Sequence, residues 1–156
     1  MSLAPLLLLV AQAVPVAAEE PVAAYQAIDA NAGSRAFTGD AMATAFHGRA
    51  GIARIVDDLV ATNQADPRIS DIFKGQDLVR LRRVLKEQFC FLLGAGCIYS
   101  GRDMATAHKD MGIQANDMNA LVENLQAAMR REGVPFARQN AFLAKLAPMR
   151  KHIVTR

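Results

Sequence analysis

The chain has 156 residues, enough for one domain with a buried core. Its 18 lysines and arginines barely exceed its 15 acidic residues, and no basic stripe is interleaved with aromatic residues, which argues against a nucleic-acid-binding surface. Trp is absent and only two Tyr occur, so a stacking platform for carbohydrate or bases is also disfavoured.

The first 18 residues carry no charged side chain and include an apolar run from Leu6 to about Val16 that prolines interrupt. This run is shorter than the roughly 20 apolar residues that cross a bilayer. Small residues follow it, a layout typical of a secretory signal peptide cleaved near Ala18. The run is not preceded by Lys or Arg, so a retained membrane anchor is the alternative. We expect a periplasmic or secreted protein, with no stable membrane span once the signal is cleaved.

Residues 19–40 are rich in alanine with scattered polar residues. Their pattern predicts a linker that is tied loosely to the domain, with a weak helix over residues 22–28. The folded domain is expected to begin near Ala41 and to extend to residue 156.

The first long helix after residue 51 is predicted from apolar residues at helical spacing: Ile52, Ile55, Val56, Leu59 and Val60. Asp66-Pro67 ends it, because proline disfavours helix at the residue before it. Further helices are predicted over residues 76–93, 115–132 and 136–154, with a brief one at His108. No strand-like alternation persists, so the sequence predicts an all-α fold.

Two cysteines, Cys90 and Cys97, lie seven positions apart with Gly94-Ala95-Gly96 between them. In an oxidising compartment such a pair can bridge a helix end to the loop that follows it. Two buried, reduced thiols that pack as small hydrophobic side chains are the alternative. The sequence leaves both interpretations open.

The segment from Tyr99 to His108 is the most informative part of the sequence for predicting function. A loop that contains Gly101 leads to a single His, and Met111-Gly112-Ile113 and a strongly amphipathic helix follow. His108 has apolar neighbours and no second His, Cys or carboxylate at metal-ligand spacing. This arrangement suits the one protein ligand of an iron whose equatorial ligands come from a porphyrin. The alternative is a helix-end histidine satisfied locally by Asp110 or by a backbone carbonyl.

The run Tyr-Ser-Gly-Arg-Asp-Met that precedes His108 by a few residues resembles the proximal region of group I truncated haemoglobins. Gly48 and the Gly94–Gly96 turn resemble the two glycine motifs of that family, with His47 and Ala95 as departures. Together with residues 56–58, 65–68 and 147–150, the resemblance covers about residues 42–154. It implies a truncated globin fold, a two-over-two helical sandwich that holds one haem b through His108. Because no Cys-x-x-Cys-His sequence occurs, c-type attachment is excluded and the haem is expected to be non-covalent.

The resemblance makes His108 the expected metal ligand. Further candidates for haem contact are mainly apolar: Phe73, Leu81, Leu85, Gln88, Phe89, Met104, Ile113 and Leu121. A Met and Phe stripe at helical spacing is more often plain core, which is the alternative for about half of them. Gln88 shares the face of Leu81 and Leu85 and could donate a hydrogen bond to a ligand, or else point along the helix edge toward solvent.

Many relatives place Tyr and Gln on the distal side, where these side chains hydrogen-bond dioxygen. The corresponding positions here are Val60, Leu81 and Leu85. Some relatives also have a distal His near position 84 that acts as a second axial ligand of the iron, but this chain has Val84 there. An apolar distal side lacks these donors and should therefore raise the off-rate of dioxygen. Carbon monoxide and nitric oxide depend less on such donors and should be favoured relative to dioxygen. Because a nitric oxide dioxygenase needs long-lived bound dioxygen, the apolar distal side argues against that activity.

We therefore expect a protein that reversibly binds a diatomic gas, with no catalytic side chains and with a reductase or electron donor as a further partner. A haem-based electron-transfer or gas-sensing protein is one alternative. A haem-free helical interaction module is the other.

Overall fold

The computed structural model describes residues 17–155, so almost all of the expected signal peptide lies outside the described residues. The regular elements within this range are all helical, which confirms the predicted all-α class. The α-helices are α1 (Ala41–Ala45), α2 (Gly48–Ala65), α3 (Leu78–Leu92), α4 (Met104–Ala107), α5 (Ala115–Arg131), α6 (Phe136–Leu146) and α7 (Arg150–Ile153). Short 3-10 helices are η1 (Asp29–Ala32), η2 (Ser70–Phe73) and η3 (Ala147–Met149).

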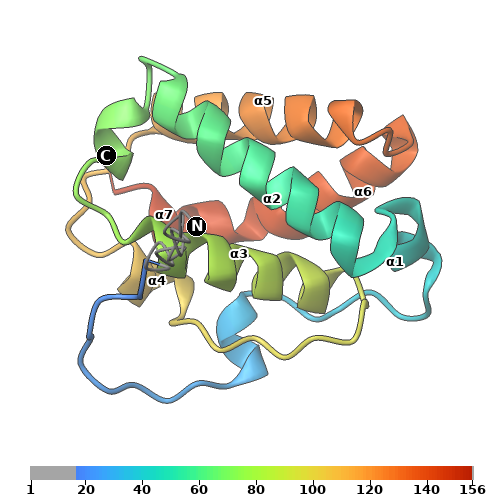
Figure 1. Ribbon diagram of the computed structural model, residues 1–156, viewed down its shortest axis with the longest axis horizontal. Coiled ribbons are helices and arrows are strands. Elements are labelled where there is room, and N and C mark those ends of the chain that lie inside the picture. Colours follow the sequence, from blue (N-terminus) through green and yellow to red (C-terminus); the bar gives the residue numbers. More distant parts are fainter. Residues whose placement is uncertain (1–16, 156) are drawn as a thin grey trace, which may run out of the picture.

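The long helices form two layers, with α2 and α3 lying over α5 and α6 (Figure 1). Helix α2 packs against both α3 and α5, and α5 packs against α6. Three aromatic side chains meet at the centre, where Phe142 packs edge-on against Phe46 and Phe89, with ring centroids 5.3 and 4.9 Å apart. This arrangement is a two-over-two sandwich. No helix among the described residues is long and apolar enough to cross a membrane.

Two of the helix predictions were wrong, one in part and one entirely. The helix expected over residues 136–154 ends at Leu146, and η3 and α7 follow, because Pro148 has no N–H to continue the hydrogen-bond ladder. The weak helix expected over residues 22–28 does not form. Its carbonyl oxygens instead accept hydrogen bonds from side chains, as Ala23 does from Arg102, and so short an isolated helix is marginal in water.

Helix α1 joins α2 through a tight turn that depends on two residues. His47 adopts a left-handed backbone (φ 57°), a conformation that favours glycine. Its Nδ1 lies 2.9 Å from Oε1 of Glu132, the C-cap residue of α5. A Cβ on Gly51 would lie 2.2 Å from the Phe46 carbonyl oxygen, so only glycine allows this close approach.

The contact of Glu132 with α2 makes stability depend on pH. The Arg54 guanidinium, whose Nη2 lies 2.6 Å from the carboxylate, is the main reason that the pKa of Glu132 falls from 4.5 to about 2; burial opposes this and His47 adds to it. Because the folded-state pKa is the lower one, the stabilisation is complete above about pH 4.5 and is lost as the pH falls toward 2. We expect Glu132→Gln to flatten this part of the stability curve. Urea unfolding at several pH values tests this, and an unchanged slope between pH 4.5 and 2 would contradict it.

Candidate functional site

The single histidine of the candidate site follows helix α4 directly. Asp103 caps this helix by accepting a hydrogen bond from the Thr106 amide at 3.0 Å. His108 is the C-cap residue of this helix, and its Nδ1 lies 2.8 Å from the Met104 carbonyl oxygen. A ring that donates through Nδ1 leaves Nε2 as the nitrogen for a metal.

Burial favours the neutral form of the His108 ring. It lowers the pKa of the imidazole below 6.5, and the hydrogen bond to Met104 opposes this with a smaller effect. A neutral imidazole is the form that binds metals. The alternative to a metal ligand was a helix-end histidine satisfied by a backbone carbonyl, and the Met104 carbonyl is such a partner. This contact engages only one of the two ring nitrogens.

Several of the apolar candidates are half-buried. Leu81 and Leu85 on α3, Phe73 in η2 and Leu121 on α5 are in this group, as is His108 itself. The C-terminal part of α3, in contrast, is mostly buried, and Leu92 has no exposed surface. Half-buried apolar side chains of this kind are the ones that a flat apolar cofactor would cover.

The other four candidates are buried. Phe89 packs against Phe142 in the central aromatic group. The carbonyl of Ile113 accepts a hydrogen bond from the Thr155 amide near the end of the chain. Gln88 and Met104 contact each other, with Nε2 of Gln88 3.5 Å from the Met104 sulfur.

Gln88 does not point toward solvent, which settles one question that the sequence left open. Its side chain is 5% exposed, and Nε2 donates to the carbonyl oxygen of Ala32 at 3.0 Å. Val60, the α2 residue expected on the distal side, is completely buried. The structure therefore brings Gln88, Met104 and His108 together and places Phe89 in the core.

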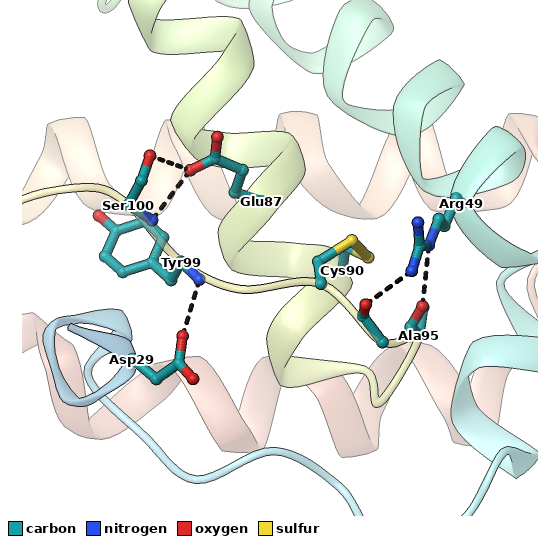
Figure 2. Close-up of a disulfide and its surroundings, with 9 residues drawn as sticks. Asp29, Arg49, Glu87, Cys90, Ala95, Tyr99 and Ser100 are labelled. Atoms are coloured by element: carbon teal, nitrogen blue, oxygen red, sulfur yellow. Dashed lines mark hydrogen bonds between the residues drawn. A yellow bond between two sulfur atoms is a disulfide. The ribbon is translucent and has the colours of Figure 1, made fainter. Parts of the chain in front are cut away.

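A disulfide between Cys90 and Cys97 fixes the loop that leads from α3 to His108. Figure 2 shows further hydrogen bonds that hold the same loop. Arg49 donates to the Ala95 carbonyl, Glu87 accepts from the Ser100 amide, and Asp29 accepts from the Tyr99 amide. The loop is thus anchored to α2, to α3 and to η1 before it reaches α4.

Loss of the disulfide should cost stability. The bridge joins residues seven positions apart, and the chain-entropy estimate for so short a loop is about 2–3 kcal/mol. We expect the double variant Cys90→Ala/Cys97→Ala to lower the free energy of unfolding in urea by about this amount. The native chain measured with a reductant is the matched control, and it should approach the stability of the variant. Equal stability of the oxidised native chain and the variant would contradict the prediction.

Residues 19–33, which we call the N-terminal strap, lie within the segment expected to be a linker. Figure 1 shows the strap running beneath α3, beside the loop that follows α3. The Tyr25 hydroxyl donates to the Ser100 carbonyl at 2.8 Å, and the Asn31 amide donates to the Gly101 carbonyl at 3.1 Å. At the other end Glu19 binds Arg83, with Nη2 and Oε2 3.0 Å apart. The strap therefore joins the start of α3 to the loop before α4.

Two arginines beside the strap, Arg83 and Arg102, have partners in this structure. Arg83 pairs with Glu19 and with Glu87, and Arg102 lies over the Tyr25 ring at 5.1 Å from its centroid. Sequence reasoning missed these strap contacts. The available signal was the pair of acidic residues that directly follows the expected cleavage site, Glu19 and Glu20.

Comparison with known proteins agrees with this geometry. A family model of bacterial-like globins matches residues 28–155, most of the chain. A group 1 truncated haemoglobin of Tetrahymena thermophila is 34% identical over 70 residues, which span 45% of this chain and 58% of that protein. One of Mycolicibacterium paratuberculosis is 28% identical over 101 residues, 65% of this chain and 74% of that protein.

Solved structures give the same result over a longer stretch. The crystal structure of truncated haemoglobin from Tetrahymena pyriformis in its Fe(III) form superposes with a TM-score of 0.70 at 26% identity. The superposition covers 74% of this chain and 98% of that protein. The match to the family model, the two-over-two sandwich and these relatives together place the chain in the bacterial-like globin family, among the truncated haemoglobins.

Proposed function

We propose that the chain holds one haem b non-covalently, with Nε2 of His108 as the protein ligand, and that it reversibly binds a diatomic gas. The observation that carries this proposal is a half-buried His108 ring whose pKa burial lowers and whose Nδ1 lies 2.8 Å from the Met104 carbonyl oxygen. Membership of a globin family supports the same conclusion. When bound, the haem would supply an iron with one open coordination position for a gas.

The side chains on this site have separable roles. The Met104 carbonyl accepts the Nδ1 hydrogen bond, which fixes the tautomer and the orientation of the ring. Leu81 and Leu85 would exclude water from the haem and offer no hydrogen-bond donor to a gas. Carbon monoxide and nitric oxide depend less on such donors than dioxygen does, so we propose that they are favoured relative to dioxygen. This weighs against a nitric oxide dioxygenase that needs long-lived binding of dioxygen.

An absorption spectrum tests the proposal directly. The protein is purified from haem-replete cells, and spectra are taken of the oxidised form and of the dithionite-reduced form, with and without carbon monoxide. A strong Soret band that shifts on addition of carbon monoxide is the expected result. A preparation with no Soret band, even after hemin is added, would overturn the haem function and favour the alternative of a helical interaction module.

We also propose export to an oxidising compartment, which the Cys90–Cys97 disulfide supports because such bridges persist there. The mass of the protein recovered from the native cell tests this, since cleavage near Ala18 removes a defined segment. A reductase or electron donor that keeps the iron ferrous is the further partner that we propose.

A further inference from the structure

Gln88 is a buried amide whose place in the fold the proposed function does not explain. It lies on the inward face of α3 between the N-terminal strap and helix α4, and it is 5% exposed. A buried polar side chain costs free energy unless its hydrogen bonds are made. The hydrogen-bond partners of Gln88 therefore indicate its role.

The Gln88 amide nitrogen has three contacts with different segments of the chain. Nε2 donates to the carbonyl oxygen of Ala32, a residue of η1 with no exposed surface. It also approaches the sulfur of Met104 at 3.5 Å, within reach of a weak hydrogen bond. A second thioether, that of Met149, lies 3.9 Å from the same nitrogen. One amide group thus joins the strap to the first residue of α4.

Met104 is also the residue that holds the His108 ring. Its carbonyl oxygen accepts from the His108 amide at 3.2 Å and lies 2.8 Å from Nδ1 of the ring. Its side chain is 8% exposed and so has little freedom to move. The Gln88 contact and the His108 contact therefore meet at one residue, at the start of a four-residue helix.

We infer that Gln88 is a positioning residue for His108: by holding the Met104 thioether and the Ala32 carbonyl together, it fixes the carbonyl that sets the tautomer and orientation of the His108 ring, and it makes that setting depend on the docked strap. As a proposal about haem ligation it rests on the proposed function. The control of the ring itself is a property of the haem-free chain as well.

The fold offers a matched control. Gln139 on α6 is likewise buried, 4% exposed, and its Nε2 donates to a backbone carbonyl, that of Val134, at 2.7 Å. Replacing either glutamine by leucine removes one buried amide and one bond to a carbonyl. Only Gln88→Leu also removes the contact with Met104. Gln88→Glu is the second test variant, because a carboxylate keeps the shape of the side chain but has no N–H to donate.

The first measurement uses the full chain without haem. Nitrogen-15 NMR at a fixed neutral pH reports which ring nitrogen of His108 carries the proton. We expect the native chain and Gln139→Leu to show His108 almost entirely as the Nδ1–H tautomer, and both Gln88 variants to show a mixture. An unchanged tautomer in both Gln88 variants, or an equal change in Gln139→Leu, would overturn the inference.

The second measurement uses the haem-loaded chain. We expect Gln88→Leu to shift the iron–histidine stretching band and to speed haem transfer to an acceptor globin by about tenfold, the lower end of what the loss of a supporting contact to a metal ligand costs. Gln139→Leu should leave the band and the transfer rate unchanged. Equal rates in the two leucine variants would overturn the inference. If no variant and no native protein binds haem, the proposed function fails, while the tautomer measurement still decides the role of Gln88.

Discussion

Replacement of His108 by alanine is expected to abolish haem retention. The substitution removes the ring whose Nδ1 lies 2.8 Å from the Met104 carbonyl oxygen and whose pKa burial lowers below 6.5. Without it, the porphyrin would keep only its contacts with apolar side chains, and haem should be lost on gel filtration. The measurement is the ratio of Soret to protein absorbance after reconstitution with hemin and desalting. We expect that ratio to fall to the background set by a protein that binds no haem.

The other two histidines provide the controls. His152 is exposed, and the His47 side chain is 49% exposed and paired with Glu132, so His47→Ala and His152→Ala should retain haem as the native chain does. Equal loss from all three variants would refute the assignment of His108. The variant His108→Gly separates a lost ligand from a lost fold, because free imidazole can enter the space and replace the missing ring. Recovery of the Soret band with imidazole is the result expected if His108 acts as the iron ligand.

The helices that the sequence predicts well are those with a complete apolar period and clear end signals. Helix α5 was expected over residues 115–132 and spans Ala115–Arg131, because Gly133 takes a left-handed backbone that stops it and Pro135 prevents continuation. The last helix shows the limit of periodicity. Met149 is buried on the same apolar pattern as α6, although the helix has already broken at Pro148. The period alone therefore cannot reveal the break, but the proline can.

The strap could not be predicted in the same way, because its contacts leave no periodic pattern. Tyr25 and Asn31 bind backbone carbonyls more than 65 residues away along the chain, as the separations of 75 and 70 residues show. A carbonyl is present at every residue, so the sequence does not mark which one is the partner. Gln88 is an intermediate case. Helical phase placed it on the inward face, but its partner Ala32 lies 56 residues away, so its role required the structure.

A methyl group at Gly101 should destabilise the protein more than any other small change in the loop before α4. A Cβ at this position would lie 2.1 Å from the hydroxyl oxygen and 2.3 Å from Cζ of Tyr99. The Tyr99 ring cannot move aside at little cost, because it is 5% exposed and its hydroxyl donates to the Arg102 carbonyl at 2.9 Å. We expect Gly101→Ala to lower the free energy of unfolding by about 3 kcal/mol, near the upper end for an overpacked site. Urea unfolding measures it.

The same substitution should also weaken haem binding, because Asn31 of the strap holds the Gly101 carbonyl at 3.1 Å and α4 begins three residues later. A double-mutant cycle isolates the cause. On a Tyr99→Ala background the added methyl meets no ring, so Gly101→Ala should then cost less than about 1 kcal/mol. Strict additivity of the two substitutions would show that the Tyr99 ring is not what excludes a side chain at this position. Strong coupling would establish that close packing of Tyr99 on Gly101 fixes the path of the chain into the helix that ends at His108.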